Sequence, residues 1–158
     1  MGSNLGDRME NLRLARAELV KAFGPVLCSS VYETDPVGCE ADSGLYLNAV
    51  AEIEYEGQPV LLLDRLQAIE KGMGRPSKRP RNAPRTIDLD ILYVGNLTLG
   101  NEEIMIPHPR LHLRRFVLEP LAEIRPELVL PGRQESVSRL LSHLPKEPSV
   151  RLFSRSLD

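Results

Sequence analysis

The stretch Thr86-Ile87-Asp88-Leu89-Asp90-Ile91-Leu92 decides how the middle of this 158-residue chain folds. Successive side chains of a β-strand point to opposite faces, so its alternation predicts a strand over 86–94 with Asp88 and Asp90 together on one face. Their Cα atoms would lie about 6.5 Å apart. Two carboxylates at this spacing repel unless a cation lies between them. Mg²⁺ suits the pair because it takes one or two carboxylates and fills its other positions with water and phosphate oxygens. Two solvated acids on a strand face would give the same pattern.

A basic loop comes immediately before the aspartates. It contains five cations and no acid: Arg75, Lys78, Arg79, Arg81 and Arg85. Arginine forks bind phosphate oxygens bidentately, while a divalent ion bridges neighbouring phosphates. Alone, such a loop could be a solvated turn or a nucleic-acid contact. Together, the loop and the acid pair indicate a phosphate-rich ligand, and the absence of a GxxxxGK[ST] motif excludes a Walker-type cradle.

The overall composition argues against nucleic acid and membrane as partners. The 20 basic and 22 acidic residues give a formal charge of −2, so the chain has no global field to attract either one. Three Phe, four Tyr and no Trp leave little surface on which bases could stack. The chain shows no membrane-length apolar run and no secretory leader, so we expect it in the cytoplasm. Cys28 and Cys39 lack metal-ligand spacing, which favours reduced thiols.

The periodicity of the remaining sequence predicts an α+β fold in a single domain, residues 1–158. The expected elements are a helix from Asp7 to Gly24, strands over 26–34 and 47–55, a helix from Pro59 to Gly72, the strand over 86–94 and a helix over 116–124. This order favours an antiparallel or mixed sheet with helices packed on one face. Residues from about 145 to 158, with their prolines and scattered charges, are expected to be weakly ordered.

Three polar or aromatic residues after the strand could also belong to a site. His108 stands between two prolines, and Arg114 and Phe116 follow it. His108 and Arg114 could contact phosphate oxygens and Phe116 a flat ring; equally, they could be a surface histidine, a surface arginine and a core phenylalanine. Near the start of the chain, the amides of the glycine-rich turn over residues 2–6 could face an anion.

Five motifs, in this order, resemble the 6-hydroxymethyl-7,8-dihydropterin pyrophosphokinase family of folate biosynthesis. They are Gly2-Ser3-Asn4-Leu5-Gly6-Asp7, Tyr46-Leu47-Asn48-Ala49, Leu66-Gln67-Ala68-Ile69-Glu70 with Gly74-Arg75, Arg81-Asn82-Ala83-Pro84-Arg85-Thr86-Ile87-Asp88-Leu89-Asp90, and Ile106-Pro107-His108-Pro109 with Arg114-Arg115-Phe116. The resemblance extends from residue 2 to about residue 130. Five ordered motifs are far more specific than any one of them.

The resemblance implies a ferredoxin-like fold and transfer of the β,γ-diphosphate of ATP to the pterin hydroxymethyl group, with release of AMP. It implies two magnesium ions held by Asp88 and Asp90, with Arg75 and Arg85 stabilising charge as catalytic residues. The implied pterin-binding residues are Thr34, Val37, Tyr46, Asn48 and Phe116. The implied ATP-binding residues are Gln67, Glu70, Arg75, Arg85, His108 and Arg114.

The chain departs from the family at two places. A strand of several residues normally precedes the glycine-serine-asparagine turn, but only Met1 does so here, so we expect the first strand to be missing. Asn82 stands where some members carry a tryptophan. Two other hypotheses therefore remain: a small nucleic-acid-binding module that uses the 75–85 loop, and an inactive truncated homologue. We expect a monomer whose partners are ATP and the pterin.

Overall fold

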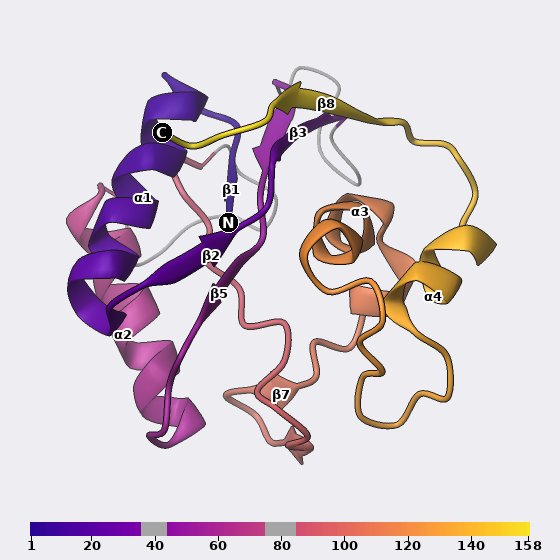
Figure 1. Cartoon of the computed structure of the whole chain (residues 1–158). Helices are drawn as coiled ribbons and strands as arrows, with labels where there is room; N and C mark the ends of the chain where they lie inside the picture. The colour runs from indigo at the N-terminus through magenta and orange to yellow at the C-terminus, as the bar shows by residue number, and fades with distance from the viewer. Residues whose placement is uncertain (36–43, 75–84) are drawn as a thin grey trace.

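The computed structural model describes residues 1–35, 44–74 and 85–158 (Figure 1). Predictions for Val37, Arg75, Asn82 and most of the basic loop lie outside these residues. The elements are β1 (Gly2–Ser3), α1 (Arg8–Phe23), β2 (Val26–Cys28), β3 (Val31–Thr34), β4 (Tyr46–Asn48), β5 (Ala51–Ile53), α2 (Pro59–Gly72), β6 (Leu99–Gly100), β7 (Met105–Ile106), the 3-10 helix η1 (Leu111–Leu113), α3 (Arg115–Ile124), α4 (Val137–His143) and β8 (Val150–Ser154).

The first two helices begin and end where local chemistry predicts. Asp7 caps α1 because its side chain accepts a hydrogen bond from the Glu10 main-chain N–H at 3.0 Å. Gly24, at φ 86°, ends this helix in a conformation that favours glycine. Pro59 occupies the first turn of α2, where its missing N–H costs nothing. The buried apolar positions are Leu12, Ala15 and Leu19 of α1 and Leu62 and Leu66 of α2.

Each of the two long strands predicted before α2 is broken. The stretch 26–34 divides into β2 and β3, and 47–55 divides into β4 and β5. At the break, the Ser29 hydroxyl accepts from the Val50 N–H at 2.9 Å, and the Ser30 N–H and hydroxyl both donate to Glu123 of α3. One main-chain hydrogen bond, from the Ser29 N–H to the Val50 carbonyl, remains here, and side-chain acceptors serve the Val50 and Ser30 amides. Apolar alternation could not reveal this break, because Glu123 is 93 residues away from Ser30 in the sequence.

The strands form small antiparallel sheets. The largest has the order β1-β4-β3-β8, and β2 pairs with β5 in a second. The prediction of a weakly ordered C-terminus was wrong for 150–154, because β8 pairs with β3 and Leu157 is buried beyond it. Prolines and charges around this strand hid it from the sequence. The α4 helix and the β6–β7 hairpin were not predicted either.

The helices cover both sides of the strands, so the prediction that they pack on one face was wrong. Helices α1 and α2 share a core with Leu47 and Ile87, whereas α3 and α4 form a second core with Val50 (Figure 1). The α+β class with antiparallel sheets is confirmed. In the described part of the chain, no helix is both long and apolar enough to cross a membrane.

Residues 87–90 keep the predicted alternation, whereas residues 91–94 are all half-buried, and residues 86–94 form no regular strand. Ile87 and Leu89 are buried, Asp88 is half-buried and Asp90 is exposed. Their ladder is reduced to one antiparallel bridge, between Gly2 and Asp88. The reason is the shortness of β1, which offers only two residues for pairing.

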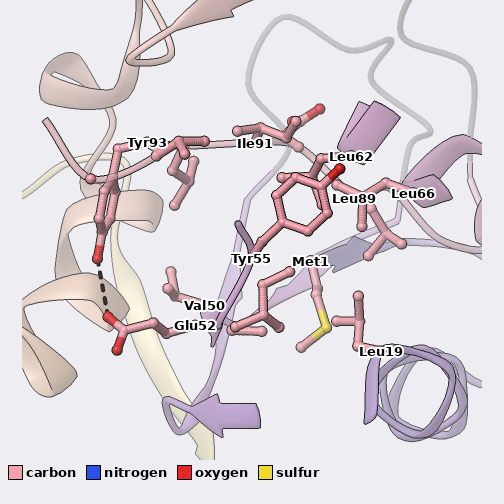
Figure 2. A pocket seen from close by; sticks show the side chains of 16 residues that line it. Met1, Leu19, Val50, Glu52, Tyr55, Leu62, Leu66, Leu89, Ile91 and Tyr93 are labelled. Atoms are coloured by element: carbon pink, nitrogen blue, oxygen red, sulfur yellow. Dashed lines mark hydrogen bonds between the residues drawn. The ribbon is translucent and has the colours of Figure 1, made fainter. Parts of the chain in front are cut away.

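Beyond this bridge the sheet is interrupted by a cavity of about 280 Å³ (Figure 2). It is lined by β5 and by residues 89–95, with Met1, Leu62 and Tyr55 between them. The main chain of Met1 exchanges two hydrogen bonds with Ala49, at 2.9 and 3.0 Å, so the line of β1 runs up to the cavity. Burial lowers the pKa of the Met1 amino group, although Asp90 and Asp88 oppose this shift. Among the residues that the structure describes, β2 is the only strand paired with β5.

Candidate active site

The main chain that carries the two aspartates is held from both edges. The Asp88 N–H donates to the Gly2 carbonyl at 2.8 Å, and the Gly2 N–H donates to the Asp88 carbonyl at 2.9 Å. The next amide, that of Leu89, donates to the Glu70 carboxylate at 2.7 Å. Glu70 projects from α2 and is only 6% exposed. The backbone between Asp88 and Asp90 is therefore fixed between β1 and α2.

Arg85 forms a close ion pair with Asp88. The guanidinium Nη1 lies 2.6 Å from Oδ2, and both side chains are about four-fifths buried, with 22% and 19% exposed. Burial alone would lower the pKa of Arg85, but Asp88 more than offsets it, so this pKa is raised. Asn4 holds the arginine main chain, because its Oδ1 accepts from the Arg85 N–H at 2.7 Å and its own N–H donates to the Arg85 carbonyl at 3.1 Å.

His108 and Arg114 lie in the same electrostatic field as the acid pair. Burial lowers the pKa of His108; Asp90 opposes this shift and Arg114 adds to it. Burial also lowers the pKa of Arg114, and both aspartates oppose that change. The His108 N–H donates to the Leu92 carbonyl at 2.7 Å, which holds the histidine beside the acid segment. The structure thus pairs Arg85 with Asp88 and places His108 and Arg114 within electrostatic reach of the two aspartates.

Three residues of the predicted pterin side meet at the ends of β3 and β4. The Asn48 amide Nδ2 donates to the Thr34 hydroxyl at 2.9 Å, and Thr34 is only 3% exposed. Tyr46 is the register partner of Thr34 and also interacts electrostatically with Arg85. A Cβ atom on Gly2 would lie 2.9 Å from the Asn48 Oδ1, so only glycine fits there without displacing the amide. The two predicted halves of the site are therefore adjacent.

Two predicted residues are less closely connected to this centre. Phe116 is half-buried in the first turn of α3, with the Arg114 guanidinium 5.5 Å from its ring centroid. This contact links it to the nucleotide side through a cation–π geometry. Gln67 is exposed on α2, and no hydrogen bond joins it to the acid pair within the described residues. The structure does not bring Gln67 into the cluster.

The glycine-rich turn contributes differently from the prediction. The amides of Gly2 and Asn4 do not face an anion, because they donate to the carbonyls of Asp88 and Arg85. Asn4 was missed as a site residue, although it is 7% exposed and its buried Nδ2 has no hydrogen-bond partner among the residues that the structure describes. The preference of asparagine side chains for nearby main-chain groups was the signal available in the sequence.

The acid pair fits magnesium better than a metal that needs a full protein cage. In the described ranges, no group of three or more His, Cys, Asp or Glu side chains gathers as a metal site. Structural zinc takes four protein ligands and calcium six to eight oxygens, whereas magnesium keeps several waters and shares substrate phosphates. Asp88 and Asp90 would supply the carboxylates for such a site.

Comparison with known proteins agrees with the geometry. Residues 1–126 match the family described as 7,8-dihydro-6-hydroxymethylpterin-pyrophosphokinase. A Haemophilus influenzae protein named 2-amino-4-hydroxy-6-hydroxymethyldihydropteridine pyrophosphokinase is 43% identical over 148 residues, covering 90% of this chain and 91% of that protein. The protein of the same name from Bacillus subtilis is 46% identical over 126 residues, covering 78% and 74%, and that from Pseudomonas aeruginosa is 38% identical over 154 residues, covering 96% and 93%. The chain therefore belongs to the 7,8-dihydro-6-hydroxymethylpterin-pyrophosphokinase family.

Proposed function

We propose that the cluster around Asp88 and Asp90 is the catalytic site at which pyrophosphate passes from ATP to the hydroxymethyl group of 6-hydroxymethyl-7,8-dihydropterin, with release of AMP. As a member of its family, the chain is an ATP-dependent pyrophosphokinase of folate biosynthesis. One observation carries the assignment of the site. The acid segment is fixed between β1 and α2, Asp88 is paired with Arg85, and the segment interacts electrostatically with His108 and Arg114.

On the nucleotide side, Asp88 and Asp90 would hold two Mg²⁺ ions. Bound there, magnesium would neutralise charge on the phosphate oxygens. Arg75 and Arg85 stabilise the charge that develops during transfer, because guanidinium groups match phosphate oxygens in geometry and sign. Before ATP binds, Arg85 is paired with Asp88, so a bound phosphate would compete for its guanidinium. The other ATP-binding residues that we propose are Gln67, His108 and Arg114.

On the pterin side, Asn48 is the residue best placed to select the ring. A side-chain amide presents two donors and one acceptor, which can pair with the polar edge of a pterin. Its orientation is already fixed by Thr34 and by the close approach of Gly2. Phe116 offers a stacking face for the ring. The remaining pterin-binding residues that we propose are Thr34, Val37 and Tyr46.

We also propose that the fold is ferredoxin-like. The position of β1 supports this, because it lies between β4 and Asp88 while the cavity continues its line. The whole chain, 1–158, would act as one domain and as a monomer in the cytoplasm. Its partners would be its two small-molecule substrates.

A single assay tests the activity. The purified protein is mixed with ATP, Mg²⁺ and 6-hydroxymethyl-7,8-dihydropterin, and AMP is quantified by chromatography. We expect AMP only when all three components are present. Failure of a folded protein to form AMP would reject catalysis and support an inactive homologue. Steeply salt-dependent binding to RNA or DNA that survives loss of both aspartates would support a nucleic-acid module instead.

A further inference from the structure

We infer that Glu70 is a positioning residue whose carboxylate holds the main chain between Asp88 and Asp90 and thereby sets the geometry of the two metal-binding side chains. The family resemblance predicts a different role, in which Glu70 contacts the nucleotide. The inference deepens the proposed function and rests on the assignment of the aspartates to magnesium.

The burial of Glu70 is the first argument. It is the one acidic residue that is buried in the described part of the chain, at 6% exposed. Burying a carboxylate is costly unless hydrogen bonds compensate for lost hydration. The contact of 2.7 Å from the Leu89 N–H is a short, charge-assisted hydrogen bond of the kind that compensates well. The buried Glu70 carboxylate is therefore suited to holding the Leu89 N–H in place.

The direction of the Leu89 amide is the second argument. In an antiparallel ladder, the main-chain groups of successive residues point to opposite edges. The Asp88 N–H and carbonyl both pair with Gly2, so the Leu89 N–H points to the other edge of the segment. Within residues 1–35, 44–74 and 85–158, no strand pairs with that edge. Glu70 supplies the acceptor that a neighbouring strand would otherwise provide.

The spacing of the anchors shows which aspartate depends most on Glu70. Asn4 holds the main chain at Arg85 and Gly2 holds it at Asp88. Glu70 holds it at Leu89, and the next main-chain anchor is the Leu92 carbonyl, which accepts from His108. Asp90 follows the Glu70 contact directly. Loss of that contact should therefore displace Asp90 more than Asp88.

Two substitutions separate positioning from a charged contact with nucleotide. Glu70→Gln removes the charge but keeps an oxygen that can accept from the Leu89 N–H. Glu70→Leu removes the acceptor at similar volume. If Glu70 positions the segment, the glutamine variant stays within a few-fold of wild type in kcat/KM. The leucine variant should lose about 10- to 100-fold, as is usual for residues that orient metal ligands. The loss should fall on kcat and on the Mg²⁺ requirement, with little change in KM for the pterin. Equal losses in both variants would overturn the inference.

A readout without turnover completes the test. Amide hydrogen exchange, followed by NMR in the protein without metal or substrates, reports the Leu89 N–H directly. We expect protection in the wild type and in Glu70→Gln, and faster exchange in Glu70→Leu. Binding of Mn²⁺ with a non-hydrolysable ATP analogue, followed by electron paramagnetic resonance, should weaken in the leucine variant. If Glu70→Leu does not fold, the glutamine variant decides: a loss of more than about tenfold with Leu89 still protected contradicts positioning.

Variants of the two aspartates distinguish a failure of the Glu70 inference from a failure of the metal assignment. If Asp90→Asn abolishes Mn²⁺ binding while a folded Glu70→Leu binds normally, only the role of Glu70 is rejected. If Asp90→Asn and Asp88→Asn both bind Mn²⁺ as the wild type does, the metal assignment fails, and the inference about Glu70 fails with it.

Discussion

Residues 88–94 are separated from β4 and β5 by a gap in the sheet, and the two halves of this gap differ sharply. In the first half, Met1 and Gly2 lie between the β4 side and Asp88, and main-chain hydrogen bonds join them to both neighbours. In the second half, β5 faces residues 90–94 across a cavity of about 280 Å³. The candidate site lies where the filled half meets the cavity. Asp88 lies in the filled half, Asp90 lines the cavity, and Glu70 holds the amide between them.

Side chains bridge the unfilled half in place of a main-chain ladder. The Tyr93 hydroxyl donates to the Glu52 carboxylate at 3.1 Å (Figure 2), and Arg125 pairs with the same carboxylate. Burial, with Glu52 adding to it, raises the pKa of Tyr93 to about 12. These side-chain contacts leave the cavity between β5 and residues 90–94. Main-chain pairing with Gly2 therefore holds Asp88, and the Glu70 carboxylate holds the Leu89 amide that precedes Asp90.

Removing either carboxylate should have the largest effect. We expect Asp88→Ala and Asp90→Ala to lower kcat by on the order of 10³-fold, because each would leave phosphate charge uncompensated. AMP release measures turnover, and circular dichroism verifies the fold. Asp64→Ala, at an exposed position of α2, is the matched control and should retain activity. Near-normal turnover in folded variants of Asp88 and Asp90 would show that the metal assignment is wrong.

Adding a side chain at Gly2, in the filled half of the gap, should have the next largest effect. In Gly2→Val the new side chain meets the Asn48 Oδ1, which lies 2.9 Å from the Cβ position. Displacing the amide should raise KM for the pterin about tenfold or more, with a smaller change in KM for ATP. Gly100→Ala has open space around it and serves as the control. A Gly2 variant with wild-type pterin kinetics would remove Asn48 from the proposed pocket.

Filling the cavity between β5 and residues 90–94 should stabilise the fold. Four residues alternating Val and Ile, added ahead of Met1, would continue the line of β1 into the cavity. Each buried side chain contributes about 1.5–3 kcal/mol, against about 1–2 kcal/mol for ordering each residue. We expect the midpoint of thermal unfolding to rise by several degrees, measured by calorimetry. A Gly-Ser extension of equal length is the control, and equal midpoints for the two extensions would mean that the cavity does not accept a strand.

The smallest expected effect concerns the side-chain bridge. Arg125, joined by Tyr93, lowers the pKa of Glu52 despite some burial. A carboxylate whose pKa is lowered on folding stabilises the protein above its ordinary pKa, about 4.3 for glutamate. That contribution disappears as pH falls through the folded value. Glu52→Gln should thus be slightly less stable at neutral pH and lose less stability on acidification. Parallel pH profiles of urea unfolding for both proteins would contradict the role of this pair.

Features set by local chemistry could be predicted from the sequence. Asp7 specifies the start of α1 as its N-cap and Pro59 that of α2 as its first residue, and the alternation around Asp88 and Asp90 specifies which faces are buried. The break between β2 and β3 could not be predicted, because its partner is Glu123 in a distant helix. For the same reason β8 was missed, since its pairing with β3 joins residues more than 100 positions apart.

The candidate site likewise contains residues that the sequence identifies and residues whose contacts depend on the fold. Arg85 and the two aspartates were identified from their types and spacing, because phosphate chemistry needs arginine and carboxylate together. His108 and Arg114 were assigned to the nucleotide side through the family resemblance. The anchors were harder to recognise. Asn4 and Glu70 act through main-chain groups of residues 85 and 89, and which amide points toward them depends on how the chain is paired. Glu70 was identified as a site residue, but its contact with the Leu89 N–H was not predicted.

We propose that Asp88 and Asp90 together hold magnesium for diphosphate transfer. The most direct measurement is the binding of Mn²⁺, in place of Mg²⁺, to the complex of the protein with a non-hydrolysable ATP analogue, followed by electron paramagnetic resonance. We predict two bound ions in the wild type, and at least one fewer, or binding weakened by about tenfold or more, in the Asp88→Asn/Asp90→Asn variant. The same number of ions bound with the same affinity in both proteins would contradict the claim.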